Sequence, residues 1–141
     1  MNLCLITPGG RGERAGNHMT ATRWSTHLRK LGHRVTLAHE FRGERTDALI
    51  ALHAYRSAES IRAFRDRHPD RPLIVAMTGT DLYQYQKTHP EITGRSIDLA
   101  DRLIVLHDLA YKVLWSVTRL LSERLRVTND NLKSFLAMSM F

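Results

Sequence analysis

The stretch PLIVAMTGTDLY, from Pro72 to Tyr83, decides the fold. Its apolar run ends in four small or polar residues, Thr78, Gly79, Thr80 and Asp81. A continuous apolar run of this length is typical of a strand buried on both faces, as inner strands of parallel sheets are. We therefore expect a buried strand that delivers a ligand-binding loop to the edge of a sheet.

Four other segments have strand character and alternate with helical patterns along the chain. This alternation predicts an α/β protein with a Rossmann-like, doubly wound parallel sheet, and such sheets bind ligands beyond the carboxyl ends of their strands. The segment from Leu82 to Arg95 carries Pro90 and Gly94, so short helices or loop are expected there. The expected strands are 2–8, 33–40, 47–55, 72–77 and 101–107, and the expected helices are 17–31, 57–68 and 108–125.

Composition narrows the class of protein. The chain has 141 residues and 43% hydrophobic content, which is enough for one domain with a core of its own. No apolar run is long enough to span a membrane, and the first residues lack the basic start of a signal peptide. The single cysteine, Cys4, lies in an apolar run and has no partner in this sequence for a disulfide. Together these features favour a cytoplasmic protein without disulfides.

A formal net charge of +7 attracts polyanions and phosphorylated small molecules. Arg62, Arg65 and Arg67 fall on one expected helix, which we interpret as a solvated face. Aromatic residues are not interleaved with these arginines, and no nucleic-acid-binding motif occurs, so nucleic acid is not the expected partner.

The glycine-rich loop from Gly9 to Gly16 is the first candidate site. Glycines let backbone N–H groups approach an oxyanion, and the helix that begins near Asn17 would point its amino end at that anion, with Arg14 adding charge. A purely structural loop is the alternative. A dinucleotide-binding loop is also open, but its acidic partner should follow about 20 residues on, and Glu40 lies farther from Gly10.

The second candidate is the loop after the strand at 72–77. Thr78 and Thr80 supply hydroxyls, Gly79 permits a sharp turn, and Asp81 either caps the next helix or accepts a hydrogen bond from a sugar hydroxyl. An ordinary strand-to-helix turn explains the same residues.

Two histidines, His53 and His107, end two other expected strands. Each is a candidate general base or phosphate ligand, or else a hydrogen-bonded spacer. No spacing of histidine and cysteine typical of a metal site occurs, so neither a metal nor another cofactor is expected.

The ordered set of motifs resembles the N-terminal half of a retaining glycosyltransferase of the GT-B type, group 1 (family four). The opening LITPGGRGERAGNHMTATRWSTHLRKLGHRVTLA carries the first part of this resemblance. The segments LIALHAYRSAESIRAFRDRHPDRPLIVAMTGTDLY and DLADRLIVLHDLA narrow it to the branch that includes selenosugar synthase. The resemblance covers roughly residues 2–113.

What the resemblance implies is transfer of a sugar from a UDP-sugar, with N-acetylglucosamine passed to a small anionic selenium nucleophile in that branch. The N-terminal domain of the family mainly holds the acceptor, and its glycine loop closes over the donor diphosphate. The implied diphosphate-facing residues are Gly9, Gly10, Arg14, Gly16 and Asn17, and the implied acceptor-side residues are His53, Thr78, Gly79, Thr80, Asp81 and His107.

The sequence departs from the family in two places. Many members carry a histidine where Thr78 stands, so no catalytic histidine can be transferred to that position. The family's C-terminal, donor-binding domain has no counterpart here, so we expect residues 1–114 to form the N-terminal domain and to be inactive alone. Residues 115–141 resemble no part of the family, and we expect an apolar helical tail that pairs two chains.

Overall fold

A computed structural model describes residues 1–9 and 16–105 of the chain. The expected helix from Asp108, the tail at 115–141 and His107 therefore lie outside the described residues. The elements are β1 (Asn2–Ile6), α1 (Gly16–Lys30), β2 (Arg34–Ala38), β3 (Ala48–Leu52), α2 (Ala58–Arg67), β4 (Leu73–Met77), η1 (Asp81–Tyr85), α3 (Gln86–Thr88), α4 (Pro90–Asp98) and β5 (Arg102–Val105).

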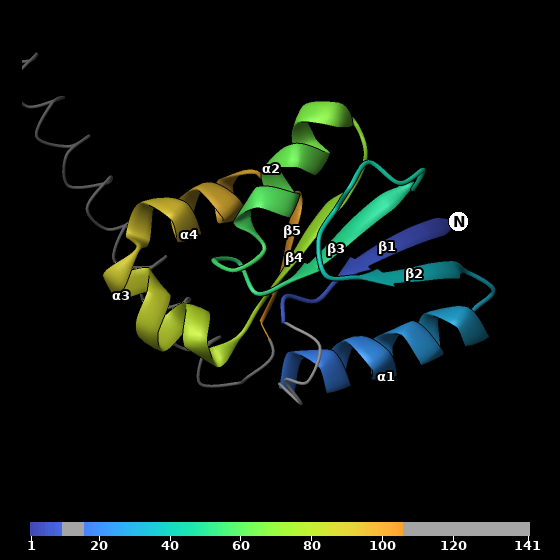
Figure 1. Ribbon diagram of the computed structural model, residues 1–141, viewed down its shortest axis with the longest axis horizontal. Helices are drawn as coiled ribbons and strands as arrows, with labels where there is room; N and C mark the ends of the chain where they lie inside the picture. Colours follow the sequence, from blue (N-terminus) through green and yellow to red (C-terminus); the bar gives the residue numbers. More distant parts are fainter. Residues whose placement is uncertain (10–15, 106–141) are drawn as a thin grey trace, which may run out of the picture. The chain divides into compact units, whose positions relative to one another are not determined.

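The strands form one sheet of five parallel strands in the order β2-β1-β3-β4-β5 (Figure 1). This confirms the α/β class and the Rossmann-like parallel sheet. Sequence order reverses between β1 and β3, because the chain leaves β1 for the edge strand β2 and then returns to β3. All five residues of the central strand β3 are buried, because helices cover both faces of the sheet.

Two apolar clusters cover the two faces of the sheet. On one face, Leu5 and Ile50 pack against Ala21 and Trp24 of α1. On the other face, a cluster that includes Cys4 contains Ile61 and Phe64 of α2, and Leu99, which follows α4, packs against it. Figure 1 shows α1 on one side of the strands and α2 and α4 on the other. The sheet is therefore covered on both faces, and its strand ends are left for ligand binding.

The prediction that Cys4 is buried is confirmed, since its exposed fraction is 1%. Burial, with a smaller contribution from Glu44, raises the pKa of this thiol to about 12, so it stays protonated and unreactive at neutral pH.

The short helices expected between Leu82 and Arg95 are present as η1, α3 and α4, and the last of these contains both Pro90 and Gly94. Proline is compatible with the first helical position, which needs no N–H partner, and the buried Thr93 and Ser96 give the helix a face to pack. At the start of α2, the Ser57 hydroxyl donates to the Leu52 carbonyl at 2.7 Å and does not cap the helix.

The arginines of α2 do not form a uniformly solvated face, so that interpretation was wrong for Arg65. Its guanidinium donates to the Leu99 carbonyl at 2.8 Å and pairs with the Asp101 carboxylate at 2.8 Å. Asp101 also accepts the Leu73 backbone N–H at 2.7 Å. This arginine therefore joins α2 to the amino ends of β4 and β5 and is not free to bind a phosphate.

No helix in the described part of the chain is both long and apolar enough to cross a bilayer.

We predict that Phe64→Ala lowers the free energy of unfolding by about 3–5 kcal/mol, because Phe64 is fully buried and packs edge-to-face on Phe41 at 5.4 Å. Urea unfolding monitored by circular dichroism measures the loss. The control is Ile92→Ala on α4, whose side chain is 44% exposed and whose loss should stay within about 0.5 kcal/mol. Equal losses in the two variants would contradict the packing described here.

Candidate functional site

The carboxyl ends of β3 and β4 bring together the residues predicted from two separate segments. His53 follows β3 directly, and residues 78–80 join β4 to η1, which begins at Asp81. Because β3 and β4 are neighbouring parallel strands, these ends meet at one edge of the sheet. We call His53, Thr78, Thr80 and Asp81 the strand-end cluster.

The Asp81 carboxylate is fully buried at the centre of this cluster. One of its oxygens accepts the backbone N–H groups of Ala54 at 3.0 Å and Thr78 at 2.9 Å, and the other accepts that of Tyr55 at 3.0 Å. Burial alone would raise the pKa of Asp81. Hydrogen bonds from His53, Thr78 and Tyr55 outweigh that effect and hold this pKa below its ordinary value, so Asp81 is a carboxylate at neutral pH.

The position of Asp81 corrects both roles expected for it. Its oxygens neither cap a helix nor face a ligand, because they hold backbone N–H groups and the imidazole of His53. A buried anion with this many donors fixes the loops after β3 and β4 relative to one another.

His53 is the partner of Asp81, and it has an unusual backbone. Its φ of +77° lies in the left-handed region, which a residue with a Cβ adopts only at an energetic cost. The side chain is 1% exposed, and its Nδ1 lies 2.6 Å from an Asp81 carboxylate oxygen. The chain turns at His53 because this pair and the bond from its N–H to the Ala76 carbonyl, 2.9 Å, hold it there.

Gly79 does not supply the sharp turn expected of it. Its φ is not positive, and a Cβ at this position would meet only the Tyr83 ring, at an ordinary contact distance of 3.8 Å. The left-handed residue of this site is His53, on the neighbouring strand end. The sharp turn expected at Gly79 is therefore absent, although the segment that contains this glycine does lie at the strand end.

Thr80 is the exposed member of the cluster. Its Oγ1 lies 3.1 Å from Nε2 of His53 and 3.0 Å from Oγ1 of Thr78. The hydroxyl of an exposed residue is thus hydrogen-bonded to a buried His–Asp pair. Such an arrangement can accept or donate a proton, or orient a ligand hydroxyl.

An aromatic column, which the sequence analysis missed, extends from the cluster. Tyr85 lies 5.4 Å from the His53 ring, Tyr55 stacks on Tyr85 at 4.1 Å, and His89 lies 4.6 Å from Tyr55, all between ring centroids. The signal was an aromatic residue shortly after each of the two strand ends, in HAY and DLYQY. The column packs one side of His53 and limits the movement of its ring.

The predicted diphosphate-facing loop is only partly described. Gly9 follows β1, and Gly16 and Asn17 open α1, while Gly10 and Arg14 lie outside the described residues. Among the described residues, the first turn of α1 carries no acidic side chain. Glu40, the acid of the dinucleotide alternative, accepts a hydrogen bond from Nε of Arg42 at 2.6 Å.

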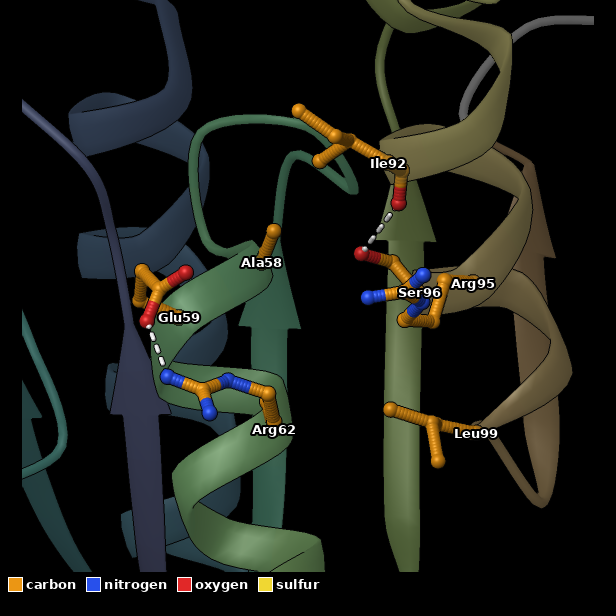
Figure 2. A pocket seen from close by; sticks show the side chains of 7 residues that line it. All are labelled: Ala58, Glu59, Arg62, Ile92, Arg95, Ser96 and Leu99. Carbon is orange, nitrogen blue, oxygen red and sulfur yellow. Dashed lines mark hydrogen bonds and ion pairs between the residues drawn. The ribbon is translucent and has the colours of Figure 1, made fainter.

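A small groove between α2 and α4 lies away from the strand-end cluster. It has a volume of about 100 Å³, and Figure 2 shows Arg62 and Arg95 on its two sides. The Arg62 guanidinium pairs with Glu59 at 2.7 Å, and the Ser96 hydroxyl donates to the Ile92 carbonyl at 3.1 Å. Its polar groups are thus largely engaged within their own helices, and we assign it no ligand.

Among residues 1–9 and 16–105, no group of three metal-binding side chains comes together.

Comparison with models of protein families finds no match for this chain, and a search of curated proteins finds no similar sequence. The class of protein is therefore defined by its Rossmann-like sheet and by the cluster at its strand ends.

We predict that Asp81→Asn lowers the free energy of unfolding at pH 7 by about 3–5 kcal/mol, because one partner of a buried pair loses its charge. The pKa of Asp81 is lowered by folding, so its stabilising contribution is present above the ordinary value of 3.8. It is lost as the pH falls through the folded value, and the difference between the two proteins should shrink there.

Urea unfolding at pH 7 and pH 3 measures both effects. Asp98→Asn, at an exposed position of α4, is the matched control and should change stability by less than about 0.5 kcal/mol. A difference between wild type and Asp81→Asn that is independent of pH would contradict the assignment of a buried carboxylate.

Proposed function

We propose that residues 1–105 are the acceptor-side, N-terminal domain of a UDP-sugar-dependent glycosyltransferase of the GT-B type. The observation that carries the proposal is the hydroxyl of the exposed residue Thr80, bonded at 3.1 Å to a buried His53–Asp81 pair at the carboxyl ends of the sheet. An acceptor needs such a group beside it, because its nucleophilic atom must be oriented and relieved of any proton it carries.

Three features support this proposal together. The order of sequence motifs resembles that family, and the parallel sheet is of the kind its N-terminal domain has. The TGTD loop, which the resemblance assigns to the acceptor side, lies at a strand end together with His53. On the same basis, the acceptor is a small anionic nucleophile, with N-acetylglucosamine transfer to selenium as the narrower form of the proposal, and the protein acts in the cytoplasm.

The proposal assigns most donor contacts to a second domain, so donor binding by this chain should be weak. Gly9, Gly16 and Asn17 are the described residues near which the donor diphosphate would lie, at the amino end of α1. Arg14 and Gly10 complete this set by resemblance alone.

We predict that UDP-N-acetylglucosamine produces weak, selective shifts in a two-dimensional amide NMR titration at physiological salt. The shifts should be confined to residues 9–17 and to the loop 78–81, because these are the proposed donor-facing and acceptor-facing segments. NADPH and a short DNA duplex, added separately, should leave both segments unchanged. Transfer of sugar should be measurable only when the donor domain of a related transferase is supplied.

Saturable shifts with NADPH would instead indicate a dinucleotide-binding module, and broad shifts with DNA that disappear at high salt would indicate a nucleic-acid-binding protein. Either result, without any response to UDP-N-acetylglucosamine, would overturn the proposed function. The variant Asp98→Asn is a suitable control, because this exposed position of α4 lies outside both segments and the change should leave the titration unchanged.

A further inference from the structure

The strand-end cluster closes into a ring of hydrogen-bonding side chains. Going around it, Asp81 Oδ1 lies 2.6 Å from His53 Nδ1, and His53 Nε2 lies 3.1 Å from Thr80 Oγ1. Thr80 Oγ1 lies 3.0 Å from Thr78 Oγ1, which lies 3.1 Å from Asp81 Oδ2. The ring thus begins and ends on the two oxygens of one carboxylate and contains four contacts.

Each contact needs one hydrogen, and a ring with a neutral histidine has only three. The two threonine hydroxyls supply one each, a neutral imidazole supplies one, and the Asp81 carboxylate supplies none. One of the four contacts is therefore without a hydrogen whenever His53 is neutral.

The contact that lacks a hydrogen is a different one in each of the two neutral forms of His53. With the hydrogen on Nε2, the bare Nδ1 would face a carboxylate oxygen at 2.6 Å, which is strongly repulsive. With the hydrogen on Nδ1, Thr80 donates to Nε2 and Thr78 donates to Asp81, so the two hydroxyl oxygens meet at 3.0 Å without a hydrogen between them. The second form is the milder, and the 3.3 Å contact of the Arg56 N–H with Nδ1 is too long to reverse this order.

A protonated His53 completes the ring. Its Nδ1–H donates to Asp81 and its Nε2–H donates to Thr80, which donates to Thr78, which in turn donates to Asp81. Every contact then has one hydrogen, and the imidazolium charge lies against a buried carboxylate. The titratable groups that face His53 are Asp81 and Tyr85, both of η1, with Tyr55 and His89 following in the aromatic column.

Resting on the proposed function, we infer that His53 is the proton acceptor of this site and that the hydroxyl of the exposed residue Thr80 carries the proton to it. The small nucleophile of the proposed function then arrives with an ionisable proton, as a hydroxyl, thiol or selenol does, and becomes anionic when that proton leaves. Asp81 and Thr78 are positioning residues, because they hold His53 and Thr80 and lie buried beneath them.

Two bonds to hydrogen break and two form in this transfer. The bond between the nucleophilic atom and its hydrogen breaks, and the proton goes to Oγ1 of Thr80. The original Thr80 O–H bond breaks at the same time, and its proton goes to Nε2 of His53. The electron pair of the broken bond stays on the nucleophilic atom, which is then an anion.

The relay through Thr80 is required by burial. His53 is 1% exposed, so a ligand reaches its Nε2 only through the hydroxyl that lies between them. The ring gains its missing hydrogen at the moment the proton arrives, and this makes proton uptake favourable.

The test is a pH titration of the free chain followed by long-range ¹⁵N–¹H NMR of the imidazole nitrogens, with the His53 signals assigned from their loss in His53→Gln. At high pH, the single hydrogen of His53 should reside on Nδ1. Thr80→Val and Thr78→Val should each lower the pH at which His53 takes up its second hydrogen, by about one unit, because each breaks the completed ring.

Thr80→Ser should retain the wild-type midpoint, because it keeps the hydroxyl. Thr22→Val removes an exposed hydroxyl of α1 that bonds only the His18 carbonyl, and it should also change nothing. A high-pH form with its hydrogen on Nε2 would overturn the inference, since that nitrogen could not accept a proton. Midpoints that agree within about 0.2 units in wild type and both valine variants would overturn it as well.

This titration contains no sugar nucleotide, so its outcome is separate from that of the proposed function. If the ring behaves as described but no transfer occurs with an added donor domain, the proposed function fails and the proton-accepting ring stands. If transfer occurs and the midpoints do not move, the inference about His53 fails alone.

Discussion

The buried pair between His53 and Asp81 is the interaction on which this strand-end site depends. It joins the ends of two neighbouring strands through a 2.6 Å contact between His53 Nδ1 and Asp81 Oδ1. It also stabilises the left-handed backbone conformation of His53, which is otherwise strained. The same carboxylate satisfies the backbone N–H groups of Ala54, Tyr55 and Thr78. Removing it would leave several buried donors without acceptors, which costs more than the loss of any one bond.

A second pair of side chains lies at the opposite end of the sheet and has a different character. Arg65 and Asp101 join α2 to the start of β4 and β5, and Asp101 is nearly half exposed. That pair uses an arginine, which stays charged, and it leads to no accessible reactive group. The pair at the carboxyl ends contains a histidine, whose Nε2 lies 3.1 Å from the hydroxyl of Thr80. Of these two pairs, the one at the carboxyl ends is therefore where we expect chemistry.

Much of the fold could be predicted from the sequence, because apolar runs and helical spacing are local signals. The buried run from Leu73 to Met77 and the polar loop after it identified both a strand and the position of the site. Short-range signals were less reliable where tertiary contacts decided the outcome. Arg65, expected on a solvated face, pairs with Asp101 from a distant part of the chain. The helix expected over 17–31 ends at Lys30, and Leu31 just after it is 72% exposed.

The chemistry of the site was harder to predict than its position. The sequence identified His53 and Asp81 separately, but nothing local shows that residues 28 positions apart form one buried pair, as the sheet register makes them do. The left-handed φ at His53 has no glycine to signal it. The stacking of Tyr55 on Tyr85 likewise arises only when the two strand ends meet.

A double-mutant cycle between His53 and Asp81 would show whether the two side chains stabilise the fold as one unit. The free energies of unfolding of wild type, His53→Gln, Asp81→Asn and the double variant would be measured by urea at pH 7. We expect a coupling energy of about 2 kcal/mol or more, because the two side chains are buried and in direct contact. Additivity within about 0.5 kcal/mol would contradict it, since the two residues would then contribute to the fold independently.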